Sequence, residues 1–217
     1  DDDAFALKVR MISNHAESSI DGSGLMELTN MIGFNFRMTE IEAAVARCQL
    51  KKLDGLLEQR QKNCNYLNDM LSEIPAIQPT MVREGAAHAY YFHPMTYDRG
   101  IAGIHRNRFI EAVKAELPVT ELREKEGVNL RSGYVKPIYL LPMFQNLQAY
   151  GTKGFPFRNP WNEETPRYAK GCCPVCERLQ EEELFVHELM RPPMTREDLN
   201  HVVDAFRKVW ENREDLR

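Results

Sequence analysis

The sequence feature that most constrains the fold is a glycine-led polar turn that begins at Gly33 and runs directly into a long helical pattern. Thr39 followed by Glu42 is typical of a capping box, in which the threonine hydroxyl accepts the Glu42 N–H and the carboxylate accepts the N–H of the capping residue. Apolar residues then recur at helical spacing until Pro75 ends the pattern. We predict one long helix, or two helices in tandem, over residues 38–74.

The composition is that of a globular protein and excludes several classes of partner. With 217 residues and 43% hydrophobic content, the chain is long enough to bury a packed core. A formal net charge of −4 and the lack of a Lys/Arg cluster argue against a nucleic-acid partner and a polybasic membrane contact. No apolar run approaches the roughly 20 residues of a membrane span, and five cysteines, an odd number, fit a reducing compartment. We expect a cytoplasmic protein with no nucleic-acid and no membrane partner.

The remaining pattern predicts an α/β chain in which helices pack a small antiparallel sheet. Residues 76–81 and 88–97 alternate as an antiparallel pair of strands would. Two prolines bracket residues 133–144, and this suits a loop lining a pocket, because proline lacks the N–H that a central strand needs. Further helices are predicted at residues 4–13, 106–117 and 174–184, and after a second capping box formed by Thr195 and Asp198.

Three cysteines form the most conspicuous candidate for metal or redox chemistry: Cys172, Cys173 and Cys176. A CxxC pair is found in thioredoxin-type sites and as half of a zinc site. The chain has no second CxxC, and the only nearby histidine is His187. The residues therefore leave two readings open, structural cysteines at a helix start or a zinc or thiol-redox site, and no metal ligand is assigned.

The polar turn and the helix after it also carry a family resemblance. Residues 33–44, read with residues 49–54 and Arg60, resemble the signature G-[YF]-N-[YF]-R-M-x-[ED]-[IL]-x-A-A … Q-L-x-x-L-D … R of the DegT/DnrJ/StrS-type sugar aminotransferases, which depend on pyridoxal 5'-phosphate. Three further pieces are similar in order along the chain: a helix ending at His15, the segment Pro137-Ile138-Tyr139-Leu140, and Cys173-Pro174-Val175-Cys176-Glu177. The resemblance covers essentially the whole chain.

The resemblance implies the C-terminal portion of an aspartate-aminotransferase-like, pyridoxal-phosphate-dependent transferase fold. It implies that residues 1–37 are the end of the large cofactor domain and an interface loop, that residues 38–74 are the connecting helix or helix pair, and that residues 75–217 are a small α+β domain. The lysine that holds the cofactor covalently is then expected upstream of residue 1. No catalytic residue is therefore assigned, and the 217-residue chain alone is expected to be inactive.

For the cofactor, the resemblance implies that Asn35 reaches across a homodimer interface to the phosphate in the neighbouring active site, with Arg37 as a second contact or brace. An amide donor and a guanidinium suit a dianionic phosphate, and the nearby start of a capped helix adds a favourable dipole. The alternative is that both residues only close the turn and pair with Glu40.

For the substrate, the resemblance places Tyr134, Lys136 and Tyr139 in the loop that faces the sugar, and His15 is expected to line the same pocket. Tyr139 stands where the family usually has histidine, and Ala16 follows His15 where glycine is usual. Lys136 adds a cation that suits a phosphate or carboxylate of an acidic or nucleotide-linked sugar, and an exposed lysine without a partner is the alternative.

The implied activity is transfer of an amino group from glutamate or glutamine to a keto-sugar, in amino-sugar or cell-surface polysaccharide biosynthesis, by a homodimer. Two alternatives from other classes stay open at this point. One is a non-catalytic dimerisation or interaction module derived from the same fold. The other is a zinc or thiol-redox protein that uses Cys172, Cys173 and Cys176.

Overall fold

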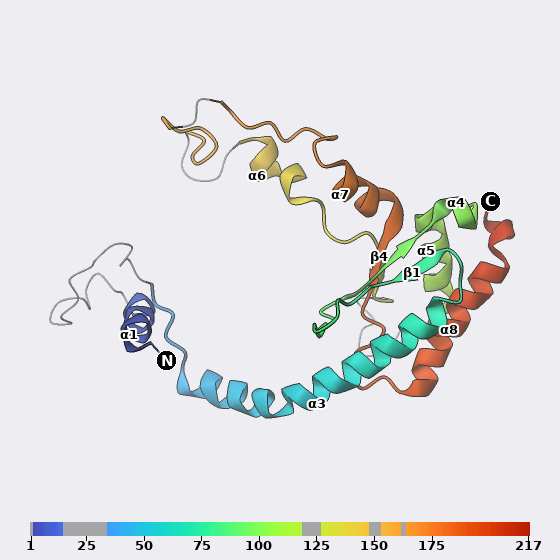
Figure 1. Cartoon of the computed structure of the whole chain (residues 1–217), viewed down its shortest axis with the longest axis horizontal. Helices are drawn as coiled ribbons and strands as arrows, with labels where there is room; N and C mark the ends of the chain where they lie inside the picture. The colour runs from blue at the N-terminus through green and yellow to red at the C-terminus, as the bar shows by residue number, and fades with distance from the viewer. Residues whose placement is uncertain (1, 15–33, 119–126, 148–152, 162–163) are drawn as a thin grey trace. The chain divides into compact units, whose positions relative to one another are not determined.

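The computed structural model of the protein is shown in Figure 1, and the residues that it describes are 2–14, 34–118, 127–147, 153–161 and 164–217. The chain divides into two compact units, residues 1–54 and 55–217, with the boundary inside the long helix α3. The domain boundaries expected at residues 37 and 74 stay predictions. None of the described helices is both long and apolar enough to cross a membrane.

Two helices dominate the first unit. Helix α1 (Asp3–Ile12) begins after Asp2, whose side chain accepts the Phe5 N–H at 2.9 Å, so the predicted first helix is confirmed. Helix α3 (Glu40–Leu71) is a single helix of 32 residues. Its capping box has formed: the Thr39 N–H donates to the Glu42 carboxylate at 2.8 Å, and the Glu42 N–H donates to the Thr39 hydroxyl at 3.3 Å.

The second unit contains a four-stranded antiparallel sheet in the order β1-β2-β4-β3. The strands are β1 (Ile77–Pro79), β2 (His93–Tyr97), β3 (Leu130–Ser132) and β4 (Leu184–His187). The predicted pairing of β1 with β2 is confirmed, but β2 is shorter than the predicted 88–97. Tyr90 has a positive φ of 49°, and its N–H donates to the His88 ring at 2.8 Å, so this segment is a turn. The sequence did not predict β3 or β4.

The hydrophobic core lies between the sheet and the helices of the second unit (Figure 1). These include α4 (Arg99–Ala102), α5 (Arg106–Glu116) and α8 (Arg196–Glu211). Buried aromatic rings connect the layers: Phe206 lies 6.1 Å from Phe109 and 5.9 Å from Phe185 between ring centroids. The capping box of Thr195 and Asp198 is present, as predicted. The remaining short helices are η2 (Ile138–Leu140), α6 (Pro142–Gln145), α7 (Pro174–Arg178), the π-helix η3 (Leu179–Glu183) and η4 (Arg213–Leu216).

Arg106, the first residue of α5, is buried and holds the end of η3 in place. Its Nη1 donates to the carbonyls of Leu179, Gln180 and Leu184 at 3.3, 3.0 and 2.6 Å, and its Nη2 donates to that of Glu181 at 2.9 Å. The last carbonyls of a helix lack partners within that helix. A single guanidinium therefore supplies the donors that this helix end needs, and it ties α5 to the start of β4.

His93 and His187 form a buried pair at the centre of the sheet. They are cross-strand partners on β2 and β4, and their ring centroids are 4.6 Å apart. His93 Nε2 lies 2.7 Å from Asn68 Oδ1, while His93 Nδ1 and His187 Nε2 are buried and have no hydrogen-bond partner in the part of the chain that the structure describes. Burial lowers the pKa of His93 to about 3, and burial also holds the pKa of His187 well below its usual value. Both rings are therefore neutral in the folded protein.

We predict that replacing Arg106 destabilises the second unit. Arg106→Met removes the guanidinium donors to the four carbonyls and should lower the free energy of unfolding by about 3 kcal/mol or more. Arg106→Lys should recover only part of this loss, because one ammonium cannot match the planar guanidinium. Urea denaturation gives both values. Arg108→Met, an exposed arginine on the same helix, is the matched control and should change the free energy of unfolding by less than about 0.5 kcal/mol.

We predict that the buried histidine pair makes stability fall as the pH drops below about 6.5. Below that pH the unfolded chain binds protons that the folded chain excludes, so each histidine lowers the free energy of unfolding by up to about 1.4 kcal/mol per pH unit. Denaturant midpoints measured between pH 7 and 5 give this slope. The double variant His93→Gln/His187→Gln should flatten it, whereas exposed His201→Gln should not. An equally steep slope in the double variant would show that other groups cause it.

Candidate functional site

The turn that carries Asn35 and Arg37 is fixed to the end of α1. The backbone N–H groups on either side of Asn35, those of residues 34 and 36, donate to the carbonyls of residues 12 and 13 at 3.0 Å each. Asn35 also forms an isolated antiparallel bridge with Asn14. The turn is therefore held at one end by α1 and at the other by the capping box of α3.

The two side chains in this turn are arranged as a pair of donors. Arg37 Nε donates to Asn35 Oδ1 at 2.7 Å, which orients the amide so that its NH₂ group points away from that contact. Both residues are exposed. The described residues show no ion pair between Arg37 and Glu40, which was the alternative partner. A free amide NH₂ beside a guanidinium is a donor set that fits a phosphate dianion.

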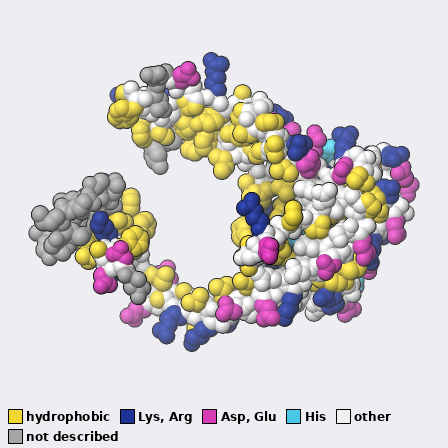
Figure 2. All heavy atoms as spheres, in the orientation of Figure 1, with side chains coloured by type: hydrophobic (Ala, Val, Ile, Leu, Met, Phe, Trp, Pro, Cys, Tyr) yellow, Lys and Arg dark blue, Asp and Glu magenta, His cyan; other side chains and the backbone are white. Residues whose placement is uncertain are grey.

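Large hydrophobic side chains are exposed on the first unit, including the neighbours of this donor pair in the sequence, and Figure 2 shows hydrophobic side chains in yellow on this part of the chain. Met38 is 65% exposed and Ile41 is 80% exposed. Apolar side chains clustered on a surface mark an interaction site. Other large hydrophobic residues exposed in this unit are Phe5, Val9, Phe34, Phe36, Val45, Leu50 and Leu53.

The candidate substrate loop, residues 133–140, lies in the second unit, and its first residue must be glycine. Gly133 has a φ of 72°, and a Cβ added there would lie 2.8 Å from the carbonyl oxygen of Gln180. The Gly133 N–H donates to the Leu184 carbonyl at 2.6 Å, and the Tyr134 N–H donates to the Gln180 side-chain oxygen at 3.0 Å. The start of the loop is thus fixed to η3 and β4 by its backbone.

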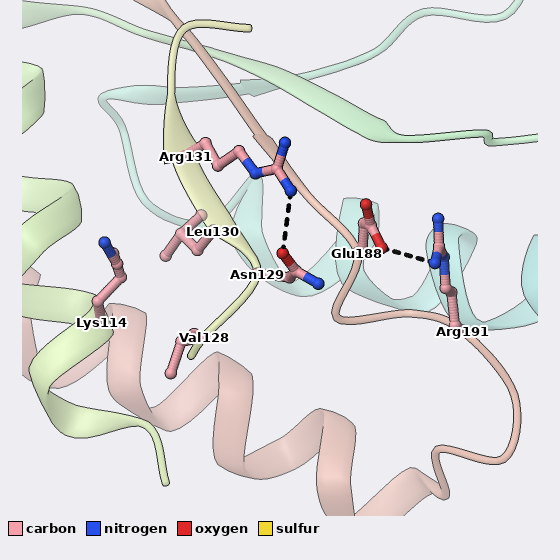
Figure 3. Close-up of a pocket in the computed structure, with 7 residues that line it drawn as sticks. All are labelled: Lys114, Val128, Asn129, Leu130, Arg131, Glu188 and Arg191. Atoms are coloured by element: carbon pink, nitrogen blue, oxygen red, sulfur yellow. Dashed lines mark hydrogen bonds and ion pairs between the residues drawn. The ribbon is translucent and has the colours of Figure 1, made fainter. Parts of the chain in front are cut away.

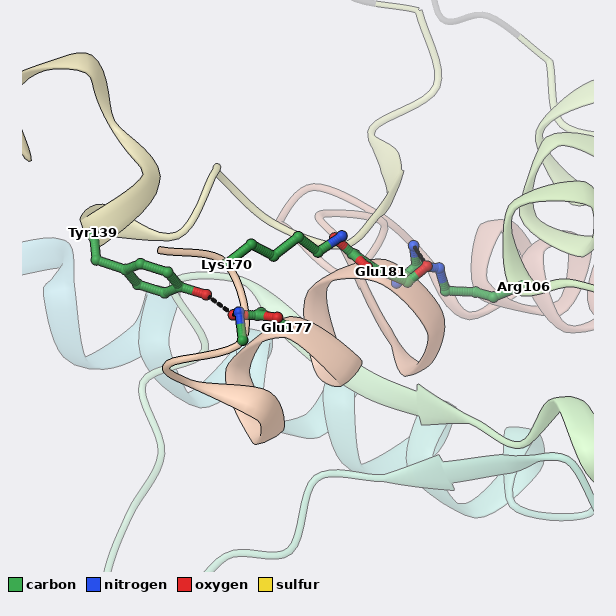
Figure 4. A network of polar contacts seen from close by, with 6 residues as sticks. Arg106, Tyr139, Lys170, Glu177 and Glu181 are labelled. Carbon is green, nitrogen blue, oxygen red and sulfur yellow. Dashed lines mark hydrogen bonds and ion pairs between the residues drawn. The ribbon is translucent and has the colours of Figure 1, made fainter. Parts of the chain in front are cut away.

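Farther along the same loop, Tyr139 is tied to Glu177 on α7 (Figure 4). The Tyr139 hydroxyl donates to Glu177 Oε1, and the Gly171 N–H donates to the same oxygen at 2.6 Å. The Tyr139 hydroxyl, followed by the Gly171 N–H, lowers the pKa of the Glu177 carboxyl. Burial, with the bond to Glu177, raises the pKa of Tyr139. The tyrosine is therefore neutral, and the carboxylate holds two segments together.

The other predicted substrate residues differ in how they are held. The Tyr134 ring packs edge-on against Phe92 with 5.1 Å between centroids. Lys136 is exposed, and in the part of the chain that the structure describes it forms no hydrogen bond or ion pair. His15 lies outside the described residues. The roles of all these side chains, and those of Asn35 and Arg37, stay predictions.

The three cysteines lie at the start of α7. Cys172 and Cys173 have their sulfur atoms 3.8 Å apart, and all three are exposed free thiols. Among the described residues, no group of three or more histidine, cysteine, aspartate or glutamate side chains is placed to hold a metal ion.

Sequence analysis gave no role to two residues that shape the candidate substrate loop, Glu177 and Gln180. The family resemblance of the segment from Cys173 to Glu177 had drawn attention to Glu177, but only the folded chain shows that Tyr139 is its partner. Gln180 stands in an ordinary polar helix pattern, and no signal in the sequence distinguishes it.

Two curated relatives match most of the chain. The spore coat polysaccharide biosynthesis protein SpsC of Bacillus subtilis is 26% identical over 96% of this chain and 48% of its own length. A putative L-glutamine:3-amino-2,3-dideoxy-scyllo-inosose aminotransferase of Streptoalloteichus tenebrarius is 28% identical over 86% of this chain and 42% of its own. The chain thus spans about half the length of these relatives.

Solved structures show the same fold at lower identity. An aminotransferase from Psychrobacter cryohalolentis aligns with a TM-score of 0.65 and 22% identity, over 94% of this chain and 48% of that one. The pyridoxal-phosphate form of the putative sugar aminotransferase Spr1654 from Streptococcus pneumoniae aligns with a TM-score of 0.61 and 17% identity, over 98% and 45%. The predicted α/β fold class, that of pyridoxal-phosphate-dependent transferases, is confirmed.

The family of this chain is assigned by comparing its sequence with the sequence pattern that a whole family of proteins shares. Enzymes of this family depend on pyridoxal phosphate, and solved members include both its pyridoxal and its pyridoxamine forms. The family pattern matches residues 1–207, which include the Asn35 turn, the substrate loop and the Glu177 element. The chain belongs to the DegT/DnrJ/EryC1/StrS aminotransferase family.

Proposed function

We propose that the protein is a pyridoxal-phosphate-dependent aminotransferase that moves an amino group from glutamate or glutamine to a keto-sugar. Membership of the family supports the reaction class. The names of the two relatives, one in polysaccharide biosynthesis and one a glutamine-dependent aminotransferase, support the classes of acceptor and donor. The observation that carries the proposal is the fixed pair of exposed donors formed by Asn35 and Arg37.

In this proposal Asn35 and Arg37 bind the phosphate of the cofactor. The Arg37 Nε–H is used to hold Asn35, so the amide NH₂ and the other guanidinium N–H groups remain to donate to phosphate oxygens. The fixed backbone of the turn keeps both donors in place before the anion arrives, and this lowers the entropy lost on binding. When bound, pyridoxal phosphate supplies the electron sink for the reaction.

The substrate loop then positions the sugar. Tyr139 presents its ring while its hydroxyl is engaged by Glu177, and the Tyr134 ring, near the start of the same loop, packs edge-on against Phe92. Lys136, which has no partner in the described part of the chain, is the side chain available for an acidic group. We propose that Lys136 orients a phosphate or carboxylate of the substrate.

We propose further that the enzyme works as a homodimer in which Asn35 and Arg37 complete the active site of the partner. The support is the exposed hydrophobic surface around the turn, with Phe34 62% and Phe36 67% exposed. Exposure of such rings to water is unfavourable, and their burial in a dimer interface would stabilise the dimer.

We predict that Asn35→Ala and Arg37→Ala in the full-length enzyme each weaken binding of pyridoxal phosphate by roughly tenfold or more, because each removes a charge-assisted hydrogen bond worth about 1.5–3 kcal/mol. Cofactor absorbance during dialysis gives the dissociation constant, and the denaturation midpoint of the apoprotein should stay within experimental error.

Asn65→Ala and Arg47→Ala are the matched controls, since both residues are exposed on α3. They should leave cofactor affinity unchanged. Unchanged affinity in the Asn35 and Arg37 variants would reject the assignment of the phosphate contact and favour the alternative of an interaction module.

We predict that Lys136→Met raises KM for an acidic or nucleotide-linked keto-sugar by roughly tenfold while changing kcat little, because the ammonium contacts a part of the substrate that does not react. Steady-state kinetics with the full-length enzyme measures both constants. Lys62→Met, an exposed lysine on α3, is the control. A fall in kcat without a change in KM would place Lys136 elsewhere in the mechanism.

A further inference from the structure

A hollow of about 500 Å³ lies at the end of the sheet where β3 begins (Figure 3). Its wall is formed by α5, by β3 with the residues just before it, and by the turn after β4. Asn129, Leu130 and Glu188 are buried in this wall, while Arg131 is exposed. The volume is within the range of small-molecule sites, roughly 300–1,000 Å³.

The lining carries more positive than negative charge. Lys114, Arg131 and Arg191 contribute three cations, and Glu188 is the only carboxylate among the lining residues. Glu188 Oε2 is paired with Arg191 Nη1 at 2.7 Å. Lys114 is paired with Glu111 at 3.1 Å, and the Glu111 side chain is 66% exposed. Such an exposed pair is weak and can exchange for a stronger partner.

Of these cations, Arg131 is the one best positioned to bind an anion. Its Nη2 donates to the neutral Asn129 Oδ1 at 3.2 Å, and its guanidinium carbon lies 5.8 Å from the centre of the Phe92 ring. Among the described residues no carboxylate pairs with it. The guanidinium is thus held in position without being neutralised, and its remaining N–H groups are free to donate.

The walls of the hollow are tied together by the backbone. The Glu188 N–H donates to the Asn129 carbonyl at 3.0 Å. Asn63 on α3 donates to the Met190 carbonyl at 3.0 Å, which fixes the turn that carries Arg191. Arg191 Nε is buried with no partner among the described residues. A rigid, net positive hollow with unused donors is the arrangement expected of an anion site.

We propose that this hollow binds the phosphate group of a small organic phosphate monoester, with Arg131 as the main ligand and Arg191, braced by Glu188, as a second. A guanidinium matches two phosphate oxygens at once, and the volume leaves room for the organic part of the ligand. The site lies in the second unit and does not depend on the proposed aminotransferase activity.

Isothermal titration calorimetry of the full chain, at constant ionic strength, tests this proposal with glucose 1-phosphate, inorganic phosphate and glucose. We expect saturable binding of the phosphates and none of glucose. Tighter binding of glucose 1-phosphate than of inorganic phosphate supports a monoester as the ligand, whereas equal affinity supports recognition of the phosphate group alone. Absence of saturable phosphate binding overturns the proposal.

Arg131→Gln should weaken phosphate binding by roughly tenfold or more. Arg191→Gln should weaken it in the same direction, and it serves if Arg131→Gln does not fold. Arg108→Gln removes the same charge from an exposed position of α5 and should have no effect. Equal weakening by all three variants would show diffuse attraction by surface charge and overturn the proposal.

A further variant separates this hollow from the proposed cofactor site. Asn35→Ala/Arg37→Ala should leave phosphate binding by this chain unchanged. If that variant abolishes it, the phosphate was bound at the Asn35 turn, and the proposal for the hollow fails while the proposed function gains support.

Discussion

The contact on which the second unit most depends is the one between the Arg106 guanidinium and the end of η3. The carbonyls that it satisfies belong to η3, which directly follows the Glu177 helix α7, and to the first residue of β4, one of the two central strands of the sheet. The buried guanidinium supplies hydrogen-bond donors where the chain passes directly from η3 into β4. The same contact therefore supports the core strand and the helix that holds the candidate substrate loop.

The elements that were predicted correctly are those whose cause is local. Both capping boxes have formed, because a threonine and an acid three residues later suffice to define a helix start. β3 and β4 escaped prediction for the opposite reason. Each has three or four residues, too few to show an alternation, and β4 directly follows the acidic run Glu181 to Glu183, which continues the helical pattern. What makes Leu184–His187 a strand is pairing with β2, some 90 residues away in the chain.

The candidate site likewise contains residues that the sequence identified and contacts that only the folded chain shows. Asn35 and Arg37 were found because a family resemblance marks the turn, and the structure adds how the turn is held. The bond between Tyr139 and Glu177 joins residues 38 apart, and no spacing rule connects a tyrosine in a proline-bracketed loop with a glutamate on a short helix. The hollow lined by Arg131 was also invisible in the sequence, because three different elements supply its cations.

The backbone anchoring of the candidate substrate loop has a consequence for how proteins with this fold evolve. Its backbone is fixed by a glycine that tolerates no Cβ, by the Gln180 side chain and by Glu177. The side chains of residues between these anchors, such as Val135 and Lys136, are exposed and carry none of that support. Replacing them alters what the loop presents without altering where it lies. The surface that the loop presents can therefore change by single substitutions while the scaffold retains its stability, so a new binding preference can arise without any change in the residues that maintain the fold.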